Sequence, residues 1–359
     1  MYDYLIIGHG LAGAVLSHHM IDKGYKIIVV DNPSKNRTSS VAAGLYNPIT
    51  GRKMVKTWMA DELFKVLEPT YQYLEKKLNT TFLYKIGIYR PFVTIEEKND
   101  WEGRFGDEKY KPYINRIAVK PSSNEVCNDK NGGLHLSQAG YLDIPTFINA
   151  NKSFLTGHGA YQELDFQEVD LKIERGYTLW RQLSFKRVIF CTGIAAQNSN
   201  LFGWLPFTPV KGELMDGTFS TELYKIYNRG VFVIPLGSKK VRVGATYRNT
   251  FEDDLPEQRG YEELCDKMNF LVNGKFSLEE LKAGIRPATK DRRPLIGKHP
   301  EYEHIYVFNG FGSKGVSMIP YFSSQFIEYL EEKNSLNEHV SINRYESLYY
   351  SWVDDQEGE

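Results

Sequence analysis

The first thirty-one residues constrain the fold more than any other part of the sequence. A short apolar run over residues 4–7 leads directly into a glycine-rich turn over residues 8–13, and residues 14–23 then show a helical pattern. A second apolar run, residues 27–30, ends in Asp31. Two short apolar runs separated by a helical pattern predict a strand, helix and strand unit whose two strands lie parallel in one sheet.

The turn has the form GxGxxG, with Gly8, Gly10 and Gly13 as its glycines. In a dinucleotide site the first glycine allows a tight turn, the second lets the backbone approach a pyrophosphate, and the third lets the helix pack close to the strand. The helix N-terminus offers free N–H groups and the positive end of its dipole to the phosphates. Asp31 is placed to accept hydrogen bonds from ribose hydroxyls, and its charge would repel a 2′-phosphate. The motif predicts a dinucleotide site that disfavours NADP and leaves FAD and NAD open.

The composition is ordinary for a soluble globular protein and leaves room for two domains: of 359 residues, 42% are apolar and 25% charged. The 44 basic and 45 acidic residues nearly balance, so we expect no nucleic-acid partner. Cys127, Cys191 and Cys265 lie far apart, which predicts a reducing compartment and no metal site. The sequence has no apolar run long enough for a membrane span and no room for a signal peptide before residue 4, so we expect a cytoplasmic protein. The sequence does not indicate the oligomeric state.

Beyond Asp31 the hydrophobic pattern alternates between helical and strand spacing. Helices are predicted over residues 61–78, 145–151, 262–271, 278–283 and 319–331. Strands are predicted over residues 82–84, 87–90, 160–169, 171–183, 187–193, 209–214, 230–235, 240–246 and 305–309. Several strands in succession between residues 206 and 273 predict a mostly antiparallel sheet.

Three further segments are rich in small residues. Residues 42–44 would permit close approach to a flat ligand, and Thr192 and Gly193 form a turn that would bring backbone to a cofactor. Residues 310–315 form a second glycine-rich connection from strand to helix. Such a connection presents N–H groups and a positive helix end.

Together these motifs resemble the D-amino-acid oxidase and glycine oxidase family of FAD-dependent oxidoreductases. The resemblance spans nearly the whole chain and rests on the order and spacing of the motifs. They are the N-terminal glycine motif with Asp31, residues 42–44, 140–143, 192–193, 209–212, 244–246, 284–287 with Asp291 and Pro294, and 310–315. The resemblance selects FAD over NAD.

The resemblance implies an α/β fold with a Rossmann-like FAD-binding domain and an inserted, mostly antiparallel α+β substrate domain. It places residues 1–80, 135–205 and 280–359 in the discontinuous FAD-binding domain. Residues 81–134 and 206–279 would form the substrate domain, whose sheet covers one face of the flavin.

The resemblance also suggests roles for single residues. Arg286, in the GxRP motif, would pair with a substrate carboxylate, and a structural arginine at the domain interface is the alternative. Phe232 stands where glycine oxidase-like sequences carry a tyrosine that also contacts the carboxylate, so that hydroxyl is missing. Arg242 lies on the strand where the sarcosine-oxidase branch places a lysine that helps oxygen react; a solvated strand arginine is the alternative. Lys314 would stabilise negative charge on a reduced flavin, or it is a solvent-facing loop lysine.

The candidate catalytic residues are therefore Arg286, Phe232 and Arg242. The candidate FAD-binding residues are Gly8, Gly10, Leu11, Ala12, Gly13, Asp31, Asn32, Ala42, Ala43, Gly44, Val169, Thr192, Gly193, Arg286, Gly310, Phe311, Gly312, Ser313, Lys314, Gly315 and Val316. Residues 284–286 include no cysteine for a covalent bond to the flavin, so we expect noncovalent FAD.

We expect an oxidoreductase that oxidises the C–N bond of a small amine or amino acid to an imine, with dioxygen as acceptor. The sequence does not indicate whether a side-chain base takes part. The alternative is a dehydrogenase of a hydroxy acid or amine that passes electrons to a quinone or protein acceptor. An oxidase acting on a tRNA side chain, or a noncatalytic flavin-binding module, is less favoured because the sequence has no basic tract for RNA.

Overall fold

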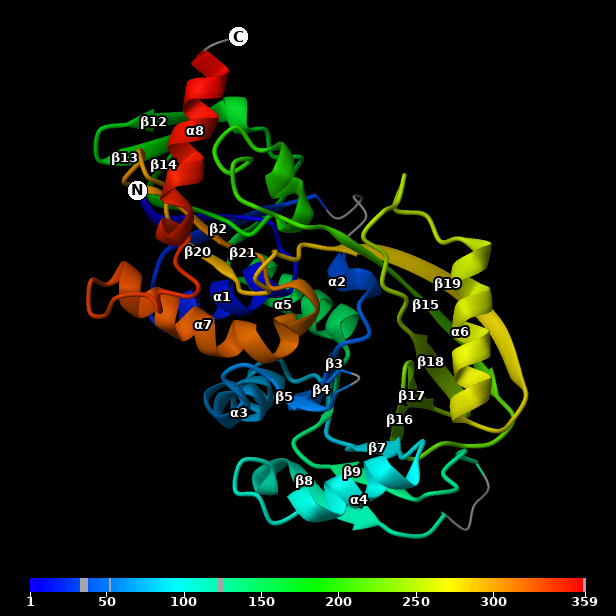
Figure 1. The fold of residues 1–359 in the computed structure, drawn as a ribbon. Helices are drawn as coiled ribbons and strands as arrows, with labels where there is room; N and C mark the ends of the chain where they lie inside the picture. The colour runs from blue at the N-terminus through cyan, green and yellow to red at the C-terminus, as the bar shows by residue number, and fades with distance from the viewer. Residues whose placement is uncertain (33–37, 52, 122–125, 358–359) are drawn as a thin grey trace.

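The computed structural model of the chain describes residues 1–32, 38–51, 53–121 and 126–357. These residues build two eight-stranded sheets. In Figure 1 the first sheet lies at the upper left and the second at the right and below. A cavity is lined by residues from both sheets.

The first sheet is parallel at its centre. Strand β1 (Tyr2–Ile7) lies between β2 (Ile27–Asp31) and β14 (Leu183–Phe190) and runs parallel to both. Helix α1 (Leu11–Asp22) connects β1 to β2, so the predicted strand, helix and strand unit is present. The sheet is completed by parallel β11 (Tyr161–Glu163) and β21 (Ile305–Asn309) and by antiparallel β12 (Leu171–Glu174), β13 (Tyr177–Trp180) and β20 (Leu295–Lys298).

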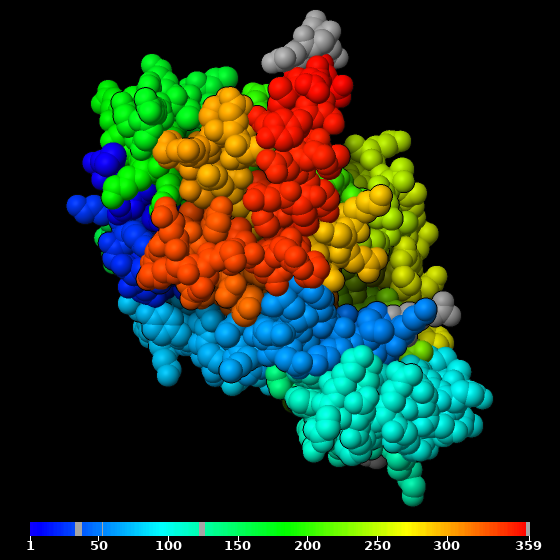
Figure 2. Space-filling view, turned by 60° about the vertical axis from the view of Figure 1, so that its left-hand side comes forward, coloured from blue at the N-terminus to red at the C-terminus, as the bar shows by residue number. Residues whose placement is uncertain are grey.

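Both faces of the first sheet are buried, as expected for a parallel sheet. Along β1, Tyr4 and Ile6 belong to one hydrophobic core and Leu5 and Ile7 to another. Helices α5 (Ile144–Gly157) and α7 (Gly315–Leu330) both pack against α1. Helix α3 (Ala60–Leu78) packs against α7. Figure 2 shows the light-blue region of α3 directly against the orange α7.

The second sheet is antiparallel except for one pair of strands, β16 and β7. Helix α6 (Gln258–Leu271) packs against β15 and β18 of this sheet. The strand order is β19 (Phe276–Arg286), β15 (Val210–Phe219), β18 (Lys240–Gly244), β17 (Phe232–Gly237), β16 (Ile226–Asn228), β7 (Ile88–Pro91), β9 (Gly133–Leu136) and β8 (Ile114–Ala118).

The remaining elements are short or peripheral. The strands are β3 (Leu45–Tyr46), β4 (Ile49–Thr50), β5 (Val55–Lys56), β6 (Leu83–Tyr84) and β10 (Gly140–Leu142). The helices are α2 (Thr38–Val41), α4 (Ile95–Arg104) and α8 (Glu346–Glu357). Short 3₁₀ helices are η1 (Lys111–Tyr113), η2 (Glu168–Asp170), η3 (Gly193–Asn198), η4 (Gly312–Lys314) and η5 (Ile342–Tyr345).

The helix predicted over residues 278–283 was wrong, because these residues lie within strand β19. Their leucine, glutamate and lysine side chains are good helix formers. However, β19 pairs with β15 from Phe276, opposite Phe219, to Arg286, opposite Val210. This long ladder with a distant segment overrides the local helix propensity.

The predicted fold class is confirmed: a Rossmann-like parallel sheet flanked by helices accompanies a mostly antiparallel sheet. The residue ranges of the two domains stay a prediction, and the boundary after residue 279 falls inside β19. None of the helices in the described part of the chain combines the length and apolar character needed to cross a membrane.

Candidate active site

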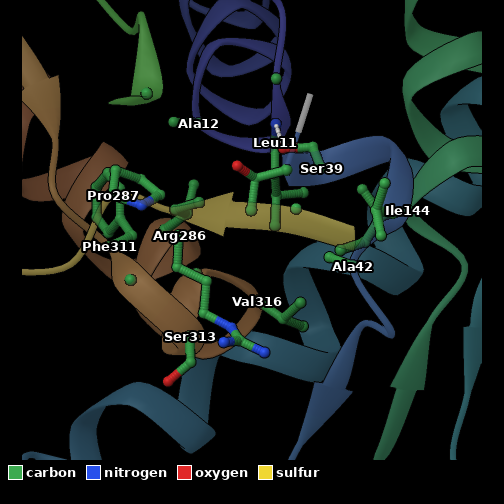
Figure 3. Close-up of a pocket in the computed structure, with 18 of the residues that line it drawn as sticks. Leu11, Ala12, Ser39, Ala42, Ile144, Arg286, Pro287, Phe311, Ser313 and Val316 are labelled. Carbon is green, nitrogen blue, oxygen red and sulfur yellow. Dashed lines mark hydrogen bonds between the residues drawn. The ribbon is translucent and has the colours of Figure 1, made fainter. Parts of the chain in front are cut away.

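A cavity of about 610 Å³ lies where the N-terminus of α1, the loop before α7 and one face of the second sheet meet. Figure 3 shows this convergence, with Leu11 and Ala12 at the start of α1, Arg286 at the end of β19 and Ser313 in the loop before α7. Three parts of the chain that are far apart in sequence thus surround one space.

The glycine motif forms the N-terminal end of the cavity. Gly8 has a positive φ of 97°, and a Cβ on Gly13 would overlap the carbonyl oxygen of Gly8. Glycine is therefore required for both the turn and the close packing of α1 on it. Gly10 is the N-cap residue of α1 and supplies no side-chain cap. The N–H of Leu11 donates instead to the Ser39 hydroxyl on α2, at 3.1 Å, as Figure 3 shows.

Asp31 lies at the end of β2 and lines the cavity. Its Oδ1 accepts from the His9 N–H at 3.0 Å, and its Oδ2 accepts from the Tyr161 hydroxyl at 3.3 Å. The His9 ring is fully buried, with Nε2 2.7 Å from Asn151 Oδ1. These contacts fix the carboxylate at the edge of the cavity.

The loop before α7 forms the opposite wall of the cavity, from Phe311 to Val316. Asn309 holds the loop in place: its Nδ2 donates to the Gly193 carbonyl at 2.8 Å, and its Oδ1 accepts from the Gly310 N–H at 2.8 Å. Part of the half-buried Lys314 side chain faces the cavity. Surrounding protein desolvates its ammonium group and lowers its pKa to about 8.

Arg286 is the last residue of β19 and extends into the cavity toward Ser313 and Val316 (Figure 3). Its guanidinium lies across Gly212 on the neighbouring strand, where a Cβ would overlap it. Its Nη1 donates to the Thr246 carbonyl at 3.4 Å, and burial lowers the pKa of the guanidinium. Because a main-chain carbonyl does not neutralise the guanidinium, its charge is available to an anion in the cavity.

A second arginine, Arg90 on β7, also lines the cavity and was missed by the sequence reasoning. Its side chain is 7% exposed, and burial together with nearby Arg229 lowers its pKa to about 10. The sequence does contain a signal for it: Arg90 is the one charged residue among the otherwise apolar residues 88–92. A charge that is buried with such a run needs an anionic partner, which could be a ligand. Its place in the cavity depends on pairing between β7 and the distant β16.

Most of the other predicted residues line the same cavity. They are Gly8, Gly10, Leu11, Ala12, Asp31, Asn32, Ala42, Ala43, Gly44, Thr192, Gly193 and Phe232, in addition to Arg286 and the loop from Phe311 to Val316. Gly13 does not line the cavity, but its lack of a side chain lets α1 pack against the Gly8 carbonyl. Gly310 does not line it either and has a positive φ of 76° in the turn after β21.

The structure corrects the assignment of Val169, which lies in η2 with its side chain 84% exposed and does not line the cavity. The lining residues are instead Leu164, Asp165 and Phe166, because the chain follows β2 only that far: the Leu164 N–H donates to the Asp31 carbonyl at 3.0 Å.

Arg242 also lies outside the cavity lining. Its Nε and Nη2 each donate to a carboxylate oxygen of Asp216 at 2.7 Å, and Lys282 donates to the same carboxylate at 3.0 Å. The alternative of a solvated strand arginine does not describe Arg242, since its side chain is held in a bidentate ion pair and is 16% exposed. Its role as a catalytic residue stays a prediction.

The residues present fit a bound FAD. A helix N-terminus without its own side-chain cap, a carboxylate at a strand end and glycines whose Cβ positions are blocked are the features that bind a dinucleotide. The buried Thr192 hydroxyl beside the cavity has no hydrogen-bond partner within the described residues. No cluster of potential metal ligands occurs among those residues.

Comparison with known proteins agrees with this geometry. The chain is 33% identical over 120 residues to a glycine oxidase of Bacillus licheniformis, and the match covers 32% of each chain, about a third of that relative's length. The fold is similar to those of a glycine oxidase from Bacillus cereus ATCC 14579 (TM-score 0.77, 18% identity, 93% and 96% of the two chains) and an iminodiacetate oxidase from Chelativorans sp. BNC1 (TM-score 0.80, 18% identity, 95% and 98%). The family model described as DAO, FAD dependent oxidoreductase, matches residues 3–326. With this match over most of the chain and a cavity built for a dinucleotide, the protein belongs to the DAO family of FAD-dependent oxidoreductases and is an enzyme.

Proposed function

We propose that this enzyme oxidises the C–N bond of a small amine or amino acid to an imine and uses dioxygen as the electron acceptor. The observation that carries the proposal is the guanidinium of Arg286, which lies in the cofactor cavity without an acidic partner among the described residues. The relatives named glycine oxidase and iminodiacetate oxidase support an amine that carries a carboxylate.

The reaction removes a hydride from the carbon that bears the amine and a proton from the nitrogen, which leaves a C=N bond. FAD, when bound, supplies the acceptor for the hydride equivalent. The electron pair passes to dioxygen, which takes up two protons and becomes hydrogen peroxide.

The side chains of this protein would bind and orient the substrate. Arg286 would hold the carboxylate through two parallel N–H donors, which fixes the direction of the amine-bearing carbon. Phe232 and Leu214 line the cavity on the same sheet and would exclude water from that carbon.

Noncovalent binding of FAD is part of the proposal. Of the three cysteines, only Cys191 lines the cavity, and burial raises the pKa of its thiol. A protonated thiol is a poor nucleophile toward a flavin. Heat denaturation should therefore release all of the yellow cofactor into the supernatant.

The test is an anaerobic screen. Amino acids, N-substituted amino acids and hydroxy acids are added to the FAD-loaded protein, and loss of the visible flavin absorbance identifies a substrate. Admission of air should restore the absorbance rapidly and produce peroxide. If no amine bleaches the flavin while a hydroxy acid does, the proposed reaction is wrong.

One observation favours a dehydrogenase as the second candidate. Arg242, on the strand where the resemblance places an oxygen-activating lysine, is neutralised by Asp216 and lies outside the cavity lining. The enzyme would then act on a hydroxy acid or amine and pass electrons to a quinone or a protein. Slow recovery of flavin absorbance in air, with rapid recovery on adding a soluble quinone, would identify this candidate.

A further inference from the structure

Arg90 is a buried cation that none of the described residues neutralises. Its side chain is 7% exposed, and its Nε is buried with no hydrogen-bond partner. Glu97 is the acidic group whose charge raises the pKa of Arg90, and Glu97 is already paired with Arg229 at 2.5 Å. A guanidinium in this position is unfavourable unless an anion accompanies it.

The pairing of the strands places Arg90 at the substrate end of the cavity. Tyr89 lies opposite Tyr227, so the next residues, Arg90 and Asn228, are neighbours on one face of the sheet. Asn228 in turn lies opposite Phe232, and all three residues line the cavity. They form a row across three strands, each about 4.8 Å from the next.

Arg286 approaches the same cavity from an edge strand of this sheet, whereas Arg90 lies on an interior strand. Arg286 is on β19, the first strand in the order, and Arg90 is on β7, beyond β15, β18, β17 and β16. The acidic residues that line the cavity in the described part of the chain are Asp31 and Asp165, and both lie at the end of β2 and β11 of the first sheet. Lys314 lines the cavity from the loop before α7, so the second sheet contributes two cationic groups, Arg90 and Arg286, and no carboxylate to the lining among these residues.

We propose that Arg90 binds a second anionic group of the substrate, so that the site takes an amine with two carboxylates, one held by Arg286 and the other by Arg90. The substrate class is an amino dicarboxylic acid or an amine bearing two carboxylate arms. This inference rests on the proposed function for the position of the reacting amine, and it adds specificity for a dianion. Phe232, between the two arginines, contacts the apolar part of the substrate.

The test measures ligand binding to the oxidised, FAD-loaded protein and does not require turnover. Straight-chain dicarboxylates from malonate to suberate are each compared with the monocarboxylate of the same carbon number, and the dissociation constant is read from the shift in the visible flavin spectrum. Low ionic strength keeps charge interactions unscreened. At the best chain length we expect the dicarboxylate to bind roughly tenfold tighter or more, because a second charge-assisted contact is made.

Three variants assign that preference to Arg90. R90M should reduce it to less than about twofold while leaving the monocarboxylate constant unchanged, and R90K should retain part of it because lysine keeps the charge but not the fork. R116M is the matched control, since Arg116 is an exposed arginine of β8 in the same sheet and does not line this cavity. It should leave the preference unchanged.

Equal binding of dicarboxylates and monocarboxylates by the wild-type protein overturns the proposal even if R90M does not fold. Loss of FAD from purified R90M, with R90K still loaded, overturns it too, because Arg90 then contacts the cofactor. The failure of the proposed function looks different: no amine bleaches the flavin, yet the dicarboxylate preference remains.

Discussion

The guanidinium of Arg286 lies directly over the Cα of Gly212, so that a Cβ at residue 212 would overlap it. Gly212 and Gly284 lie opposite each other on β15 and β19, and Arg286 follows Gly284 on the same face of its strand. The position of the proposed carboxylate-binding group thus depends on the absence of a side chain on the neighbouring strand.

Replacing Gly212 with alanine should displace Arg286 without affecting FAD. We expect KM for an amino acid substrate to rise by roughly tenfold or more, equivalent to about 1.4 kcal/mol. The measurement is steady-state kinetics with the bound flavin quantified by absorbance. Gly284→Ala is the control, since a Cβ there would meet Thr38 Cα at 3.5 Å, an ordinary contact. Equal effects of the two substitutions would contradict this account of Arg286.

A substitution at Gly13 tests how closely α1 packs against the turn that precedes it. A Cβ at Gly13 would overlap the Gly8 carbonyl, so Gly13→Ala should lower the free energy of unfolding by about 1–3 kcal/mol and reduce FAD occupancy. Gly157→Ala, near the end of α5, has open space around the new Cβ and should be neutral or stabilising by up to about 1 kcal/mol. Urea unfolding and flavin content of both variants would reveal the difference.

Lys314 should make the stability of the cofactor-free protein depend on pH. Burial lowers its pKa from 10.5 to about 8 in the folded state, so between these values the unfolded chain binds more protons than the folded one. Stability should therefore rise as the pH increases from 8 to 10.5, with the penalty fully present below pH 8. Urea unfolding of the wild type and Lys314→Met across this range isolates the effect, because other groups titrate equally in both. Parallel curves for the two proteins would show that the Lys314 ammonium is well solvated.

The N-terminal half of the cavity could be predicted because its information is local. Gly8, Gly13 and Asp31 lie within one strand, helix and strand unit, where spacing alone determines their positions. The assignment of Val169 depends on a feature that spacing does not reveal. The chain leaves β2 after Leu164, and Val169 does not line the cavity.

The substrate end could not be predicted in the same way, because it depends on pairing between distant segments. Arg90 reaches the cavity only because β7 joins β16, about 140 residues later in the chain. Arg242 was placed on a strand correctly, but its pairing with Asp216 depends on the register between β18 and β15. Local propensity does not specify either contact.

The most direct test of the account is the reductive half-reaction of wild-type protein and Arg286→Ala. Each FAD-loaded protein is mixed without oxygen with the best amino acid substrate from the screen, and the loss of flavin absorbance is followed over substrate concentration. We expect the variant to retain FAD and to lose roughly thirtyfold or more in apparent second-order rate, since truncating one partner of a buried charge pair costs about 2–5 kcal/mol. A variant that is reduced as fast as the wild type, with unchanged concentration dependence, would contradict the assignment of the carboxylate to Arg286.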